Sequence, residues 1–248
     1  MDNVLLITGA SRGIGAATAR LAAQGGWDVA VNYTANALAA DEVVRAIRAT
    51  GGRAIAVQAD VADEAQVLRM FETVDAKLGR LTGLVNNAGV VDVTARLDEM
   101  SVARWRRMFD INVIGSMLCA REAVRRMSTR HGGSGGAIVN LSSAASRLGS
   151  PGQYLDYAAA KGAIDAFTIG LAKEVAIEGI RVNAVRPGLI HTEIHASGGE
   201  PGRVERLQGQ VPMKRGGTAD EVANAVMWLL SDASSYTTGS VLDVTGGR

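Results

Sequence analysis

Two patterns of hydrophobic and polar positions alternate along this chain of 248 residues. Short runs rich in Val, Ile and Leu are typical of buried strands, and the longer Ala-rich segments with apolar residues at i, i+3 and i+4 are typical of helices with one buried face. The predicted strands are Val4–Thr8, Asp28–Tyr33, Ala54–Gln58, Leu84–Asn86, Ala137–Leu141, Arg181–Arg186 and Ser240–Val244. Helices are predicted at Ile14–Gln24, Ala40–Ala49, Glu64–Leu78 and Glu221–Leu230, among other segments.

This alternation predicts an α/β fold, in which a doubly wound, seven-stranded parallel sheet is flanked by helices. No segment combines Pro, Ser and charge in the manner of a linker, so residues 1–248 are expected to form a single domain. The most irregular stretch is 188–217, after the sixth predicted strand. In a parallel α/β sheet, an insertion at this point is a candidate substrate lid, and we call residues 188–217 the lid segment.

Composition excludes several classes of function. The chain is 47% apolar and 21% charged with a formal net charge of +1, so no overall field attracts it to nucleic acid or to an anionic membrane. No apolar run approaches the roughly 20 residues of a membrane-spanning helix, and no signal peptide is apparent at the N-terminus. The single cysteine, Cys119, lies in an apolar run and is expected to be buried. We expect a cytoplasmic location.

A glycine-rich turn follows the first predicted strand and leads directly into a predicted helix. Small residues there let the backbone approach a diphosphate and direct helix N-terminal N–H groups at it. The spacing differs from the general G-x-G-x-x-G fingerprint, and such turns also occur without a ligand, so the turn alone leaves both interpretations open. The candidate cofactor residues of this turn are Gly9, Ser11, Arg12, Gly13, Ile14 and Gly15.

The end of the second predicted strand bears on which cofactor is bound. In NAD-binding sheets, an Asp or Glu there accepts hydrogen bonds from the ribose hydroxyls. Here the positions hold Asn32, Tyr33 and Thr34, and Arg12 offers a cation for a 2′-phosphate. NADP(H) is therefore favoured over NAD(H). The alternatives are a solvated Arg12 and a Tyr33 that only covers the strand.

A tyrosine and a lysine are placed for proton chemistry. Tyr157 and Lys161 are four residues apart and lie on one face of a predicted helix. A nearby cation is expected to stabilise the phenolate and lower the pKa of Tyr157. Ser143, after the strand Ala137–Leu141, could hydrogen-bond the same substrate oxygen. Because Tyr-x-x-x-Lys also arises by chance, the rest of the sequence must show whether this pair is catalytic.

The sequence resembles the short-chain dehydrogenase/reductase family, a group of single-domain Rossmann-fold oxidoreductases, along nearly the whole chain. The segments that carry the resemblance occur in family order at family spacing: they are Thr8–Gly15, Asp60–Val61, Asn86–Gly89, Asn112, Ser143, Tyr157, Lys161 and Pro187–Thr192. The resemblance implies a catalytic tetrad of Asn112, Ser143, Tyr157 and Lys161, in which Asn112 holds a water that connects Lys161 to solvent.

The resemblance also assigns cofactor contacts. It implies that Asp60 and Val61 hold the adenine, that Lys161 contacts the nicotinamide ribose, and that the Asn86–Gly89 turn supports the adenosine ribose. Further candidates are Asn87, Ala88 and Gly89 in that turn, Tyr157 and Lys161, and Pro187, Gly188, Ile190 and Thr192 around the nicotinamide ring. Alternatively, Asn87 only satisfies backbone groups and Thr192 is an ordinary helix N-cap.

The serine assignment depends on the direction of counting. Counted from the preceding strand, the family's serine falls on Ser143, next to Ser142, whereas counting back from Tyr157 gives Ala144 because one extra residue precedes the tyrosine. We follow the strand-side count. The extra residue places Tyr154 near the pocket, where it either shapes specificity or packs.

Two features suggest other chemistry. His191 and His195 flank Glu193, but the H-E-x-x-H pattern needs the acid beside the first His and no third ligand is evident, so no metal is expected. Arg121, Arg125, Arg126 and Arg130 form a basic stretch; in carrier-protein ketoacyl reductases of this family, such residues and a second basic site dock an acidic carrier. Glu178 occupies that second site here, so a free small molecule is expected.

The sequence therefore predicts an NADP(H)-dependent oxidoreductase that interconverts a carbonyl and a secondary alcohol or sugar hydroxyl. A non-catalytic NADP(H)-binding sensor or scaffold and a 3-ketoacyl-carrier-protein reductase are the alternatives. The family resemblance also implies a homotetramer with the catalytic helix and the C-terminal strand at its interfaces.

Overall fold

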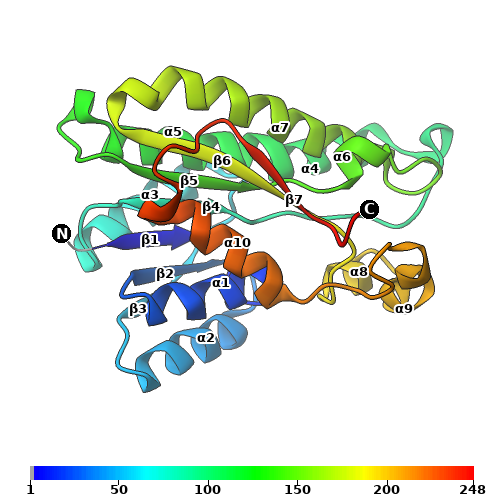
Figure 1. Ribbon diagram of the computed structural model, residues 1–248, viewed down its shortest axis with the longest axis horizontal. Helices are drawn as coiled ribbons and strands as arrows, with labels where there is room; N and C mark the ends of the chain where they lie inside the picture. Colours follow the sequence, from blue (N-terminus) through cyan, green and yellow to red (C-terminus); the bar gives the residue numbers. More distant parts are fainter. Residues whose placement is uncertain (1–2) are drawn as a thin grey trace.

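The fold was obtained as a computed structural model, which describes residues 3–248. Seven parallel strands form one sheet in the order β3-β2-β1-β4-β5-β6-β7, so the predicted α/β fold is confirmed (Figure 1). The strands are β1 (Val4–Ile7), β2 (Asp28–Tyr33), β3 (Ala54–Gln58), β4 (Gly83–Asn86), β5 (Gly136–Leu141), β6 (Ile180–Pro187) and β7 (Val241–Val244). All seven predicted strands are present, with ends that differ by one residue at most.

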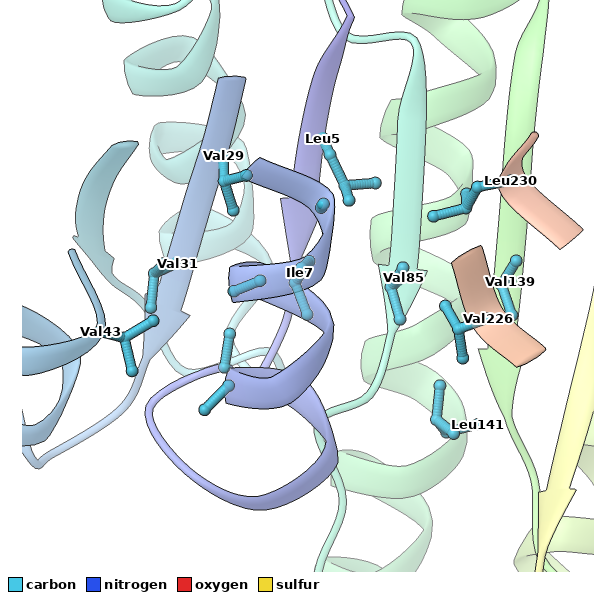
Figure 2. Close-up of a cluster of buried hydrophobic side chains, with 14 of the residues drawn as sticks. Leu5, Ile7, Val29, Val31, Val43, Val85, Val139, Leu141, Val226 and Leu230 are labelled. Atoms are coloured by element: carbon cyan, nitrogen blue, oxygen red, sulfur yellow. The ribbon is translucent and has the colours of Figure 1, made fainter. Parts of the chain in front are cut away.

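Helices cover both faces of the sheet. One face is covered by α1 (Gly13–Gln24), α2 (Ala37–Ala49) and α10 (Ala219–Leu230), and the other by α3 (Glu64–Lys77), α4 (Val102–Phe109), α5 (Gly115–Met127) and α7 (Leu155–Val175) (Figure 1). Each layer closes over its own apolar core. Figure 2 shows part of the first, with Leu5, Val29 and Val226 spread along the layer between the sheet and its helices. No described helix is long and apolar enough to cross a membrane.

The strand order reverses beside β1, which pairs with β2 on one side and with β4 on the other. In such sheets a crevice opens at the carboxyl ends of the strands at this point, and ligands bind there. The β1–α1 turn and the residues after β4 both lie at this crevice. The fold thus brings the predicted cofactor turn to the Asn86–Gly89 turn.

The lid segment lies at the same end of the sheet and contains two short helices, α8 (Ile194–Ser197) and α9 (Arg203–Leu207) (Figure 1). Its two ends are joined: the His191 N–H donates to the Gly217 carbonyl and the Gly217 N–H donates to the Leu189 carbonyl, both at 2.9 Å. A parallel bridge between Ile190 and Gly217 results. The segment is therefore a closed excursion from the end of β6.

Candidate active site

A cavity of about 350 Å³ lies between the sheet end, the catalytic helix α7 and the lid segment. Its size is that of a small-molecule site. It brings together ten of the predicted residues: Ile14, Asn87, Gly89, Ser143, Tyr157, Lys161, Pro187, Gly188, Ile190 and Thr192. These residues come from positions throughout the chain, so the fold, and not the local sequence, assembles the site.

Tyr157 and Lys161 face the cavity from the first turns of α7. The Nζ of Lys161 lies 5.5 Å from the centre of the Tyr157 ring and donates to the Leu141 carbonyl at 2.7 Å. That hydrogen bond ties the ammonium to the end of β5. The lysine is thus held beside the phenol although its side chain is almost fully buried.

Burial, and not the neighbouring cation, dominates the titration of this pair. Burial raises the pKa of Tyr157 to about 12, and a hydrogen bond with Ser143 acts in the opposite direction. The expected lowering of the tyrosine pKa by Lys161 is therefore wrong for the cofactor-free protein. The same burial lowers the pKa of Lys161 to about 8, against the pull of Asp165. Both shifts disfavour charge in the cavity.

The two adjacent serines have different surroundings. The Ser142 hydroxyl is buried and donates to the Lys161 main-chain carbonyl at 3.2 Å. The Ser143 hydroxyl accepts from the Ala145 N–H at 3.1 Å and is the one that contacts Tyr157. This geometry agrees with the count made from the strand side.

Asn112 lies in a widened π-helical segment, Asp110–Ile114, that joins α4 to α5. Its side chain is committed to backbone groups: Oδ1 accepts from the Val90 N–H at 3.2 Å, and Nδ2 donates to the carbonyls of Val90 and Met108 at 3.1 and 3.0 Å. A Cβ on Gly89 would lie 2.7 Å from Asn112 Oδ1 and 3.5 Å from Lys161 Nζ. Gly89 therefore lies between the two side chains, and only a glycine fits there.

The cofactor turn has the shape that a diphosphate requires. Gly9 and Gly13 adopt positive φ angles of 60° and 56°, and a Cβ on Gly15 would lie 2.5 Å from Asn87 Nδ2. Asn87 Nδ2 in turn donates to the carbonyls of Thr8 and Gly9. The Asn87 side chain thus satisfies backbone groups of the turn, and the residue also lines the cavity. Bare glycines and the N-terminus of α1 fit a dinucleotide.

Several predicted cofactor residues lie outside the cavity lining. They are Gly9, Ser11, Arg12, Gly13, Gly15, Asn32, Tyr33, Thr34, Asp60, Val61 and Ala88, and the predicted catalytic residue Asn112 is outside the lining as well. Arg12 is exposed at the N-cap of α1, and its guanidinium donates to the Ser197 hydroxyl at 3.2 Å. Thr34 is exposed at the end of β2, and Asp60 Oδ1 accepts from the Ala62 N–H after β3.

Asn32 needs a correction. It was predicted to contact the cofactor, but its side chain is buried beneath the glycine turn. Oδ1 accepts from the Gly9 N–H at 3.0 Å, and Nδ2 donates to the carbonyls of Val57 and Ala59 at 3.3 and 3.0 Å. All three hydrogen bonds are made with backbone groups. Asn32 therefore supports the turn from below, with its buried side chain hydrogen-bonded to backbone groups.

The lid segment contributes residues that sequence reasoning did not assign. Arg203 lines the cavity, its guanidinium lies 4.9 Å from the centre of the Tyr154 ring, and it donates to Gln153 Oε1 and to Glu200. The Tyr154 hydroxyl also donates to Glu200, at 3.2 Å. The extra residue before Tyr157 thus ties α7 to the lid segment. No sequence signal links Arg203 to Tyr154, because the contact is long-range.

The two lid histidines lie in different places. His195 lines the cavity, whereas His191 is exposed and its Nδ1 lies 3.8 Å from Glu205. Thr192 covers the cofactor turn: a Cβ on Gly13 would lie 3.4 Å from its methyl carbon. The N-cap of α8 is Glu193, so Thr192 is not a helix cap.

The family is decided by comparison with known proteins. Residues 9–248 match the model of a family described as enoyl-(acyl carrier protein) reductase. The chain belongs to the short-chain dehydrogenase/reductase family. Oxidoreductases of this family use a nicotinamide cofactor, NAD or NADP.

Relatives cover the chain from end to end. It is 57% identical over 245 residues to an uncharacterized oxidoreductase of Escherichia coli, with 99% of each chain covered. It is 42% identical to a 3-oxoacyl-[acyl-carrier-protein] reductase of Synechocystis, covering 98% of this chain and 96% of that one. A mutant short-chain dehydrogenase/reductase of Serratia marcescens has a TM-score of 0.90 at 31% identity, covering 99% and 97%. The chain is thus an oxidoreductase of short-chain dehydrogenase/reductase type throughout its length.

Proposed function

We propose that this enzyme reduces a carbonyl of a free small molecule to a secondary alcohol, or catalyses the reverse reaction, with NADP(H) as its cofactor. The observation that carries the proposal is the joint placement of Ser143, Tyr157 and Lys161 on one cavity with the glycine turn at its rim. A bound nicotinamide would supply or accept the hydride.

The protein's own residues handle the proton. With its pKa raised to about 12, Tyr157 is protonated at neutral pH and donates that proton to the substrate oxygen during reduction. Ser143 hydrogen-bonds the same oxygen and Lys161, fixed by the Leu141 carbonyl, stabilises the phenolate that remains. Asn112 holds the Val90 backbone in place through two hydrogen bonds, and a water held by Asn112 would connect Lys161 to solvent.

The NADP(H) assignment rests on charge at the nucleotide end. No carboxylate lies at Asn32, Tyr33 or Thr34 to repel a 2′-phosphate, and the exposed Arg12 guanidinium lies at the start of α1. Asp60, Val61 and the Asn86–Gly89 turn would then border the adenosine. Fluorescence titration tests this: NADPH is expected to bind more tightly than NADH, and tighter NADH binding would overturn it.

The basic stretch on α5 favours a free substrate over a carrier-bound one. Its arginines are paired within the chain: Arg121 with Glu64, Arg125 with the buried Glu122, and Arg126 with Asp75. The Arg130 guanidinium lies 3.9 Å from Glu178. An acidic carrier would have to compete with these carboxylates. Equal turnover of a ketoacyl carrier protein and its free acyl analogue would contradict this.

Turnover separates an enzyme from a non-catalytic NADP(H) sensor. We expect NADPH oxidation with members of a panel of ketones, aldehydes and keto esters, and NADP reduction with alcohols or sugars. Tyr157→Phe should lower the turnover rate by at least about 100-fold while NADPH still binds. Full activity of that variant would refute the mechanism, and NADPH binding without any turnover would favour the sensor.

The proposed homotetramer has support in exposed apolar side chains on the helices of one face. Phe109 on α4, Met117 on α5 and Ile169 on α7 are each 37–42% exposed. Exposed apolar side chains that gather into a patch mark protein interfaces, and these three are candidates for such a patch. Sedimentation should show an assembly of four chains at micromolar concentration, and a stable monomer would remove this part of the proposal.

A further inference from the structure

His195 lines the cavity but has no role in the proposed proton transfer from Tyr157. It lies on α8 and lines the same cavity as Tyr157, Tyr154 and Arg203. Its Nε2 atom lies 3.1 Å from the Ile190 carbonyl oxygen. Because a carbonyl only accepts, Nε2 must carry the proton in this contact. The contact therefore fixes the tautomer of the ring.

In this tautomer, Nδ1 is a hydrogen-bond acceptor. No residue of the described chain, 3–248, donates a hydrogen bond to it. Burial lowers the pKa of His195, and the charges of Arg203 and His191 act in the same direction, against the Ile190 carbonyl and Glu200. This direction favours the neutral ring, in which the Nδ1 atom of a cavity-lining side chain keeps a lone pair that can accept a hydrogen bond.

Arg203 sets the charge of this part of the cavity. Its guanidinium is paired with the Glu200 carboxylate, donates to Gln153 Oε1 at 2.5 Å, and stacks on Tyr154. Two hydrogen bonds and one stacked ring hold it in place, and its carboxylate partner Glu200 also pairs with Arg206 at 2.6 Å. A substrate anion would meet an arginine that already has a carboxylate partner, and it would also be repelled by the lone pair of a neutral imidazole.

We propose that His195 Nδ1 accepts a hydrogen bond from a hydroxyl group that the substrate carries away from its reacting carbonyl. The substrate class is then a hydroxylated ketone or aldehyde, or a polyol in the direction of oxidation. This inference rests on the proposed function, because it names the substrate of that same cavity. An unhydroxylated ketone would leave the acceptor desolvated without a partner, which a buried polar group does not tolerate well.

Matched substrates test the inference in the unmodified enzyme. Short linear and cyclic ketones are each supplied as the parent compound, a hydroxylated analogue and a carboxylated analogue, with NADPH and with NADH. We expect kcat/KM for the hydroxylated member to exceed that of the parent by on the order of 10-fold to 100-fold, with no such gain for the carboxylated member. Equal values for parent and hydroxylated compounds, or a preference for the carboxylate, would overturn it.

A pair of histidine variants assigns the preference to one residue. His195→Phe keeps a ring of similar size without its acceptor and should abolish the preference, mainly through a higher KM for the hydroxylated substrate. His191→Phe changes the other lid histidine, which is outside the cavity, and should leave the preference intact. If the preference survives in His195→Phe, this inference is wrong and the proposed function is unaffected. No turnover of any member with either cofactor removes the proposed function as well.

Discussion

Arg104 and Asp156 form a bidentate, nearly buried ion pair that joins α4 to the first turn of the catalytic helix. Nε of Arg104 lies 2.7 Å from Oδ2 of Asp156, and a terminal nitrogen lies 3.1 Å from Oδ1. The same Oδ1 accepts from the Tyr157 N–H at 3.0 Å. The arginine also donates to the Val93 carbonyl. The pair thus fixes the backbone from which the Tyr157 side chain projects.

Arg104→Ala should therefore be strongly destabilising. It leaves the Asp156 carboxylate buried without its partner, a change that costs about 3–5 kcal/mol of unfolding free energy. Chemical denaturation measures this directly. Arg107→Ala is the matched control: Arg107 lies on the same helix but pairs with Asp92 at 3.4 Å with its side chain 55% exposed, so its loss should cost about 1 kcal/mol or less. Equal losses for the two variants would contradict this account.

The two serines after β5 should differ sharply in activity. Ser143→Ala removes the hydroxyl that contacts Tyr157 and should lower kcat/KM by on the order of 100-fold to 1,000-fold. Ser142→Ala removes only a bond to the Lys161 main-chain carbonyl and should retain most activity. Steady-state kinetics with any substrate found in the ketone panel decides between them. The reverse order of effects would transfer the catalytic role to Ser142.

The sheet was predictable because its signal is local. A buried parallel strand such as β1, which is Val-Leu-Leu-Ile, is a continuous apolar run, so its position follows from the sequence alone. Tyr157 and Lys161 were predictable for the same reason, because helix geometry places residues four apart on one face.

Contacts between distant segments were not predictable. Asn32 carries no sign in the sequence that its amide is turned inward, since that depends on the carbonyls of Val57 and Ala59 across the neighbouring strand. Arg203 and Tyr154 meet only because the lid segment folds back over α7. The raised pKa of Tyr157 likewise depends on burial by the assembled cavity, which outweighs the hydrogen bond with Ser143. Residue type and spacing alone do not determine these contacts or this pKa.

The inward amide of Asn32 leads to a prediction about cofactor choice. Asn32→Asp would place a carboxylate oxygen against the carbonyls of Val57 and Ala59, which now accept from Nδ2. We expect a lower Tm and weaker binding of NADPH and NADH by a similar factor, because the glycine turn is disturbed. An unchanged Tm with a switch to NADH would instead mean that residue 32 contacts the ribose.

Arg12→Ala should act on one cofactor only. If the guanidinium pairs with the 2′-phosphate, NADPH binding should weaken by on the order of 10-fold while NADH binding and Tm stay unchanged. Arg20→Ala, an exposed arginine later on α1, is the control and should alter neither affinity. Fluorescence titration measures all four constants. Equal weakening of both cofactors by Arg12→Ala would remove the phosphate contact.

The buried Lys161 ammonium should lower the free energy of unfolding when no cofactor is bound. Its pKa is about 8 in the folded chain and 10.5 ordinarily, a gap that corresponds to roughly 3 kcal/mol. Below pH 8 the folded protein carries a buried ammonium and the full cost is present. Between pH 8 and 10.5 the unfolded chain holds a proton that the folded chain has released, so wild-type stability from this group rises with pH.

Lys161→Met should therefore be stabilised relative to wild type by an amount that is larger at pH 7 than at pH 10. The lost hydrogen bond to the Leu141 carbonyl reduces the gain, and the difference between the two pH values reports the net effect of the ammonium. Denaturation without cofactor measures it, and Lys173→Met, an exposed lysine on the same helix, should show no such pH dependence. A Lys161→Met effect that is constant with pH would mean that the ammonium is already solvated in the free enzyme. If the effect is instead large at pH 7 and small at pH 10, the folded cavity holds a buried Lys161 ammonium that lowers the free energy of unfolding.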